Sequence, residues 1–217
     1  MAGSKEKKIK DSTGSLVEQA ETHILKLIET KRLQPGEYID FVAIADDLNS
    51  SRTPIRESIR QLHSLGLVEP VSGGHFRVTT LNTKQIRSYY AVRLGLELKA
   101  STLAAERITD PELELLKHNM EIFEAQACGS DLLPQIDTQF HEIIYDASRN
   151  RYVAKRLKEL RLVLGLLPRN SFENPERFEN IIKEHKNIID ALENRDVSRS
   201  MSATKMHIEH AMHPLTS

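Results

Sequence analysis

The chain has 217 residues, of which 39% are hydrophobic and 28% charged, and its net charge at pH 7 is −1. This composition is typical of one large or two small folded domains and argues against global disorder. No apolar run approaches the roughly 20 residues of a membrane span, and the near-zero charge restricts any DNA-binding surface to a local patch.

The N-terminus, residues 1–14, is polar and rich in lysine, which predicts a flexible tail. It lacks the apolar core of a secretion signal. The single cysteine, Cys128, cannot form an internal disulfide. Together these features predict a cytoplasmic protein with no membrane partner.

Residues 15–80 are predicted to form a winged helix-turn-helix. Apolar residues at helical spacing indicate a first helix over about 15–31 and a second over about 40–48. A third helix follows, and two short runs of β-forming residues around a Ser-Gly-Gly turn then indicate a hairpin.

The third helix has marked ends and two different faces. Thr53 is the expected cap, Pro54 the first helical residue, and Gly66 the left-handed residue that ends the helix. An apolar stripe lies beside a face that carries Arg56 and Arg60, as a recognition helix requires. An amphipathic surface helix with solvated arginines is the alternative, but the hairpin favours DNA binding. The residues predicted to contact DNA are Arg52, Thr53, Pro54, Arg56, Arg60, Gly73, Gly74 and His75.

Residues 82–217 contain no convincing strand and are predicted to form an all-α bundle of six helices. A cap residue stands before each apolar-periodic run, several times with proline just after it. The fold class is therefore mainly α, with an N-terminal winged helix-turn-helix and a C-terminal six-helix bundle. The expected caps are Asn82, Asp110, Asp131, Asn150, Asn174 and Asp196.

Two sets of motifs make the chain recognisable. The segment 33–78, with "SRTPIRE" followed by "LGLV", resembles the DNA-binding domain of the GntR family. The runs "YYAVRLGLE" and "FHEIIYDASRN", followed by two later histidines, resemble the FadR-type effector domain, called FCD, in its VanR-like six-helix branch. The resemblance implies a bacterial repressor or activator that binds a palindromic operator in double-stranded DNA as a homodimer and responds to a small metabolite.

Two departures leave the operator sequence open. Many relatives carry an arginine or glutamate early in the second helix, where this chain has Phe41 and Val42. Many also carry a basic residue before the glycine of the wing, where this chain has Ser72.

Four residues of the bundle are candidate metal ligands. Asp137 and His141 are four positions apart, so both lie on one helix face. His185 lies among isoleucines, close to a core-facing stripe. Spacing alone leaves open that each histidine is an ordinary polar residue. The resemblance, which extends to His207, implies a metal site at all four.

The proposed ligands are three imidazoles and one carboxylate. Nitrogen and oxygen ligands without thiolate suit Zn²⁺, Ni²⁺, Mn²⁺ or Fe²⁺, and Zn²⁺ is the first choice on affinity and abundance. The other two histidines of the last helix, His210 and His213, are expected to face solvent.

The metal would serve to bind a metabolite. A small carboxylate effector could fill its open coordination positions, with the guanidinium of Arg93 as a second anchor. The alternative for Arg93 is an ion pair with Glu97 on a helix surface.

The residues also allow two alternative functions. A metal-dependent hydrolase could use the same Asp/His₃ centre to activate water, but no clear general base is found. Glu142 and Glu184 adjoin ligand positions, and neighbours on a helix point about 100° away. A regulator of the TetR type is also all-α, but that class lacks a wing.

Overall fold

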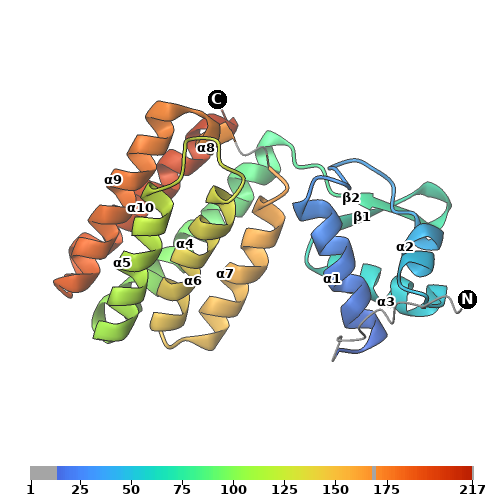
Figure 1. Ribbon diagram of the computed structural model, residues 1–217, viewed down its shortest axis with the longest axis horizontal. Helices are drawn as coiled ribbons and strands as arrows, with labels where there is room; N and C mark the ends of the chain where they lie inside the picture. Colours follow the sequence, from blue (N-terminus) through green and yellow to red (C-terminus); the bar gives the residue numbers. More distant parts are fainter. Residues whose placement is uncertain (1–13, 168–169, 217) are drawn as a thin grey trace, which may run out of the picture. The chain divides into compact units, whose positions relative to one another are not determined.

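The computed structural model describes residues 14–167 and 170–216 (Figure 1). The chain divides into two compact units, one ending at Thr80 and the other beginning at Leu81. Apart from Gly14, the predicted N-terminal tail lies outside the described residues.

The first unit is a three-helix domain with a β-hairpin. Strands β1 and β2 pair antiparallel, with Val68 opposite Val78 and Val71 opposite His75. Its core includes Ile24 of α1 and Ile59 of α3, both essentially inaccessible to solvent. The winged helix-turn-helix prediction is therefore confirmed. In chain order the elements are α1 (Leu16–Glu29), α2 (Phe41–Asp47), α3 (Arg52–Ser64), β1 (Val68–Val71), the 3₁₀ turn η1 (Ser72–Gly74) and β2 (His75–Val78).

Local signals explain most of these boundaries. Helix α1 begins with a capping box, in which the Ser15 hydroxyl accepts from the Glu18 amide at 3.2 Å and the Glu18 carboxylate accepts from the Ser15 amide at 2.7 Å. The carboxylate of Asp40 caps α2. Gly66 has φ +84°, the left-handed conformation expected after α3.

The predicted start of α3 was wrong by two residues. The helix begins at Arg52, and the residue before it, Ser51, makes no side-chain cap hydrogen bond. Thr53 therefore lies inside the first turn and is not the cap residue. The first-turn amides of α3 are left for other partners.

The second unit is an all-α bundle. Helix α4 packs against α10, α7 and α6, while α5 packs against α6 and α9. Six long helices were predicted and are found; the four-residue α8 is an addition that no pattern indicated. Their bounds are α4 (Thr83–Arg107), α5 (Asp110–Glu124), α6 (Leu133–Ala147), α7 (Arg151–Leu164), α8 (Asn170–Glu173), α9 (Pro175–Glu193) and α10 (Val197–Thr216).

Most of the predicted caps of the bundle are present. The side chains of Asn82, Asn150 and Asn174 accept from first-turn amides, and Asp196 accepts from the amide of Arg199 at 2.9 Å. Two were misplaced. Helix α5 is capped by Thr109, which forms a capping box with Glu112, and α6 begins after Leu132 without a side-chain cap.

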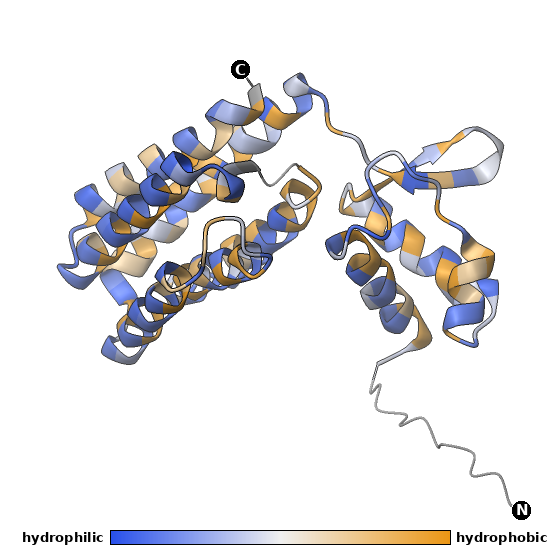
Figure 2. Ribbon diagram, turned by 45° about the horizontal axis from the view of Figure 1, so that its top comes forward, coloured by the Kyte–Doolittle hydropathy of each residue, from blue (hydrophilic) through white to orange (hydrophobic). Residues whose placement is uncertain are grey.

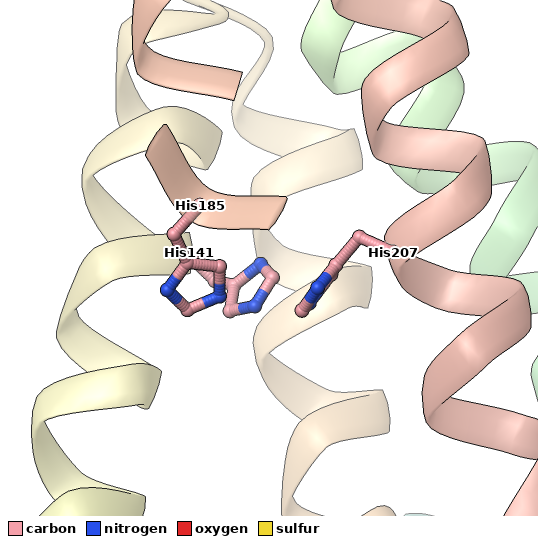
Figure 3. Close-up of side chains that lie close together, drawn as sticks. All are labelled: His141, His185 and His207. Carbon is pink, nitrogen blue, oxygen red and sulfur yellow. The ribbon is translucent and has the colours of Figure 1, made fainter. Parts of the chain in front are cut away.

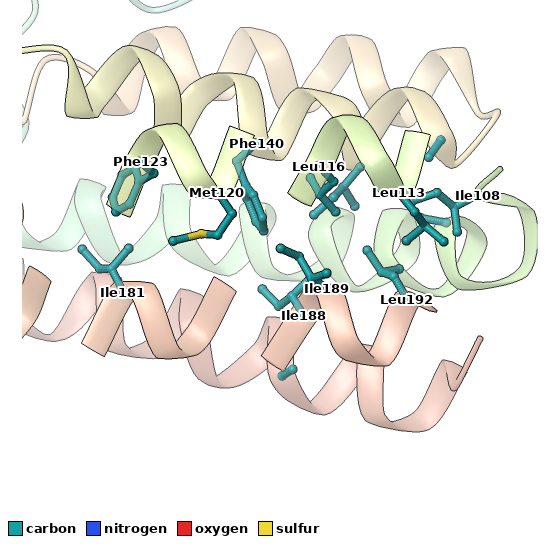
Figure 4. Packing of buried hydrophobic residues seen from close by; sticks show 14 of the residues in the cluster. Ile108, Leu113, Leu116, Met120, Phe123, Phe140, Ile181, Ile188, Ile189 and Leu192 are labelled. Atoms are coloured by element: carbon teal, nitrogen blue, oxygen red, sulfur yellow. The ribbon is translucent and has the colours of Figure 1, made fainter. Parts of the chain in front are cut away.

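The bundle core is a continuous apolar cluster (Figure 4). Phe123 of α5 and Phe140 of α6 are both 1% exposed, and isoleucines of α9 pack below them. Polar residues interrupt the helices of the chain (Figure 2). Among the described residues, no helix has an apolar stretch that could span a membrane. Helix α5 packs against both α6 and α9. This packing places the histidines of α6 and α9 close together.

Candidate DNA surface and metal centre

One face of α3 is open to solvent and carries arginines. Arg52, Thr53, Arg56 and Arg60 are exposed, whereas Pro54 is half-buried. On the opposite face Ile55 is buried in the core. A shallow surface hollow on the exposed face is lined by Thr53, Arg56, Glu57, Arg60, Gln61 and Ser64.

The wing presents the other predicted contact residues. Gly73, Gly74 and His75 are exposed. Gly73 and Gly74 have φ +79° and +77°, which explains why glycine stands at both positions. The ring of Tyr38, 64% exposed, meets the edge of His75 at 6.4 Å between centroids.

Aromatic contacts join the wing to the helices. The ring of Phe41 lies 6.3 Å from that of Phe76 in β2, and the Arg56 guanidinium lies 6.0 Å from the Phe41 centroid. The Nδ1 atom of His63 lies 3.0 Å from the carbonyl oxygen of Val68. Phe41 therefore packs against the wing beside the arginine face.

In the second unit three imidazoles meet inside the bundle (Figure 3). They come from α6, α9 and α10, and their ligand atoms lie within 4.8 Å of one another. His141, His185 and His207 are 2%, 0% and 3% exposed. Residues as far as 66 positions apart in the chain (141 to 207) are thus brought to one point, as the family resemblance implied.

Asp137 lies beside this cluster. Its Oδ1 atom is 3.5 Å from Nε2 of His185 and 3.8 Å from Nε2 of His141. These distances exceed those of a good hydrogen bond, yet they place a carboxylate oxygen and two imidazole nitrogens around one point. All four predicted ligands are therefore neighbours.

The nitrogens of the cluster fit a metal ion. Among the described residues, Nε2 of His141 and both ring nitrogens of His185 are buried without a hydrogen-bond partner. Buried polar atoms are normally paired, because an unpaired one costs about 1–3 kcal/mol. The His185 ring is also held in place, since it stacks on Phe140 at 3.9 Å between centroids.

The protonation of these imidazoles suits the same role. Burial lowers the pKa of His185 to about 3. Burial, followed by the positive charge of Arg161, holds the pKa of His141 well below its ordinary value of 6.5. Both rings are neutral at pH 7, and a metal ligand must offer a lone pair rather than a proton.

Arg161 of α7 is a part of the site that the sequence analysis missed. Its Nη2 atom donates to Oδ2 of Asp137 at 2.6 Å. Burial alone would raise the pKa of Asp137, but the charge and hydrogen bond of Arg161, together with the nearby imidazoles, lower that pKa. The two residues are 24 positions apart on different helices, so no local pattern could have paired them.

Glu184 was also missed as a contributor. It points away from the position of His185, as expected for a neighbour, but onto α10, where it accepts from Nδ1 of His207 at 2.8 Å and of His210 at 2.7 Å. Burial would raise the pKa of Glu184, yet hydrogen bonds from His207 and Arg177 bring it to about 2. His210 is exposed to solvent, as expected, but its Nδ1 atom also pairs with Glu184.

Arg93 is buried beside the cluster. Its Nε atom donates to Oε1 of Glu97 at 3.1 Å, and the Tyr145 hydroxyl donates to the same oxygen at 2.6 Å. The alternative i, i+4 pair is thus present, but in the interior and not on a helix surface: Arg93 is 6% exposed and Glu97 2%.

Two domain families match the chain. Residues 16–78 match the bacterial regulatory proteins of the gntR family, and residues 88–210 match the FCD domain. The first match covers the helices and wing of the first unit, and the second covers the histidine cluster.

Individual relatives agree with these matches. YdhC, an uncharacterized HTH-type transcriptional regulator of Bacillus subtilis, is 26% identical over 188 residues, which cover 85% of this chain and 84% of YdhC. The HTH-type transcriptional repressor RspR of Escherichia coli is 22% identical over 181 residues, covering 82% and 78%. The structure of McbR/YncC of Escherichia coli superposes with a TM-score of 0.79 at 22% identity, covering 94% and 98% of the two chains.

Proposed function

Because the chain belongs to the GntR family of bacterial regulatory proteins and carries an FCD effector domain, we propose that it is a metabolite-responsive transcriptional repressor. In this proposal a homodimer binds a palindromic operator, and a metal-containing pocket in the second unit binds a small carboxylate. The family and the relatives are transcriptional regulators and not enzymes, so the hydrolase alternative has no support. The wing also removes the TetR-type alternative.

The exposed arginines of α3 carry the DNA-binding half of the proposal. Arg52, Arg56 and Arg60 share an open face, where they can reach phosphates and guanine edges. The wing glycines allow the backbone to approach the duplex closely, and His75 at the wing can contact the sugar-phosphate backbone. Pro54, half-buried, would shape the start of the helix beside these contacts.

The buried imidazoles carry the metal-binding half. Asp137, His141, His185 and His207 would hold a divalent ion, with Zn²⁺ as the first choice and Ni²⁺, Mn²⁺ or Fe²⁺ as alternatives. When bound, the ion would supply a positive centre for an anionic ligand. Four protein ligands leave one or two positions open in five- or six-fold coordination.

Charge balance supports a carboxylate as the effector. Arg161 pairs with Asp137 and Arg93 pairs with Glu97, so these buried charges compensate one another, and His141 and His185 are neutral. A divalent ion therefore adds positive charge that an anionic effector would offset. Arg93 remains our candidate for the second anchor; it would have to share its guanidinium between Glu97 and the effector.

The homodimer is proposed to form through the exposed face of α4. Val92 is 56% exposed there, and a Cβ added to Gly95 would meet no atom within 4 Å. Glycine inside a helix costs about 1 kcal/mol relative to alanine, and no contact within the described part of the chain requires it here. The close approach of a second copy of the chain would require a glycine at this position. A regulator that binds an operator would act in the bacterial cytoplasm.

The decisive experiment measures operator affinity as a function of metal and ligand. An operator is first selected in vitro with the wild-type chain. Organic acids are then screened by thermal shift with Zn²⁺, since a ligand of the native state raises the melting temperature. We expect a carboxylate that stabilises the Zn²⁺-loaded protein and weakens operator binding. Effector binding that is unchanged by chelation would reject the metal-containing pocket, and no binding to any selected DNA would reject the regulator.

A further inference from the structure

The carboxylate of Glu184 is fully occupied by hydrogen bonds. Its Oε1 accepts from Nη1 of Arg177 and Nδ1 of His210, both at 2.7 Å. Its Oε2 accepts from Nη2 of Arg177 at 2.9 Å and Nδ1 of His207 at 2.8 Å. Glu184 is 4% exposed. A buried carboxylate with two donors on each oxygen has one orientation available to it.

This arrangement decides which nitrogen of His207 carries the proton. An ionised carboxylate accepts hydrogen bonds and donates none, so Nδ1 of His207 must be the protonated nitrogen. In the neutral imidazole the lone pair is then on Nε2. The ring itself lies 5.1 Å from that of His141 and 4.8 Å from that of His185, between centroids. The free nitrogen is thus the one available to the cluster.

We propose that Glu184 is the positioning residue for the metal ligand His207, and that Arg177 and His210 hold Glu184 in place. The inference rests on the proposed metal centre. An imidazole whose second nitrogen donates to a carboxylate is a better-oriented and more basic metal ligand. Arg177 adds a bidentate contact from the same helix, so Glu184 can be buried and charged.

A purely structural role for Glu184 is the competing explanation. Its bonds also connect α9 to α10, and such a connection would stabilise the bundle whichever nitrogen of His207 carried the proton. The two roles differ in one measurable respect. If Glu184 positions His207, its effect on metal affinity must depend on the presence of the His207 ring. If Glu184 only connects the two helices, its effect on metal affinity does not depend on that ring.

The test is a double-mutant cycle on Zn²⁺ affinity in the full-length chain. Affinity is measured by competition with a chromophoric chelator for the wild type, Glu184→Gln, His207→Ala and the double variant. We expect Glu184→Gln to weaken Zn²⁺ binding about 10–100-fold and to have little further effect once His207 is alanine. Wild-type affinity in Glu184→Gln, or an equal loss in both backgrounds, would overturn the proposal.

Two further variants keep the cycle interpretable. Glu193→Gln, on the same helix, removes an exposed carboxylate that pairs with Lys117 at 2.8 Å and should keep wild-type affinity. His210→Ala removes one of the four bonds at a half-exposed position, so it should fold even where Glu184→Gln does not, and we expect a smaller loss of affinity. No loss in His210→Ala would remove His210 from the arrangement.

The ¹⁵N chemical shifts of the imidazoles separate this inference from the metal centre itself. In the metal-free wild type we expect His207 as the Nδ1–H tautomer. A chain that binds Zn²⁺ but carries the proton on Nε2 of His207 would overturn the role of Glu184 alone. A chain that binds no Zn²⁺ would overturn the metal centre, and the role of Glu184 with it.

Discussion

The two oxygens of Asp137 face different partners: Oδ2 accepts from Arg161 at 2.6 Å, while Oδ1 lies 3.5 Å from Nε2 of His185. Both side chains of the ion pair are largely buried, at 14% and 13% exposure. Arg161 therefore compensates the charge of Asp137 in the interior and leaves one oxygen directed at the imidazoles. The ion pair therefore holds the Asp137 carboxylate in position for metal binding even when no metal is bound.

Arg161→Met should destabilise the metal-free protein by about 3 kcal/mol, because it leaves the buried carboxylate of Asp137 without its partner. The free energy of unfolding in urea is the measurement. The double variant Arg161→Met/Asp137→Asn should recover part of the loss, since neither charge remains. If the destabilisation of the double variant equals the sum of the destabilisations of the two single variants, the broken ion pair is not the cause of the loss.

His185→Ala should abolish stoichiometric Zn²⁺ binding. The wild type should gain about 2.7 kcal/mol of stability when free Zn²⁺ is 100 times its Kd, and the variant should gain almost nothing. Metal content after dialysis and melting temperatures with and without chelator are the readouts. His118→Ala, an exposed histidine of α5, is the matched control. Full Zn²⁺ occupancy in His185→Ala would reject this ligand.

Acid should destabilise the metal-free protein through His185. Its pKa is about 3 in the folded chain and 6.5 as a model value. Between these values the unfolded state binds a proton that the folded state does not, so stability falls as the pH falls. One such group contributes about 1.4 kcal/mol per pH unit.

The comparison that isolates this effect is urea unfolding in chelator at pH 6.5, 5.5 and 4.5 for the wild type and His185→Asn. The variant lacks the titrating ring, so its stability should depend less steeply on pH. Identical slopes would show that His185 is not protonated on unfolding in this range.

Arg56→Ala should weaken binding to the selected operator while the fold stays intact. A lost phosphate contact lowers affinity and reduces the slope of log affinity against log salt by about 1, whereas a lost guanine contact costs about 1–3 kcal/mol and relaxes specificity at one position. Titrations at several salt concentrations distinguish the two. Arg199→Ala, an arginine of α10 in the other unit, is the control. Unchanged affinity at matched salt would remove Arg56 from the interface.

Val92→Glu should shift the protein from dimer to monomer, because it places a charge in the centre of the proposed α4 contact. Mass from light scattering at several concentrations measures this, and operator affinity should fall in parallel. Leu115→Glu alters a leucine of α5 with similar exposure, 54%, and should leave the dimer intact. A monomeric wild type, or a dimer sensitive only to Leu115→Glu, would contradict the assignment.

The winged helix-turn-helix and the helical bundle follow from local features of the sequence. Caps such as Asn150, the left-handed Gly66 and the apolar periodicity of α3 act within a few residues, so their consequences can be read locally. Family motifs then linked His141 to His185 and His207.

The surroundings of those histidines depend on how the helices pack against one another. Arg161 reaches Asp137 from another helix, and Glu184 reaches His207 across the α9–α10 contact. Neither pair has a characteristic spacing, because the register of one helix against another is set by the packing of the whole core. A buried charge is tolerated only beside its partner, and that partner can come from any helix that the core brings near.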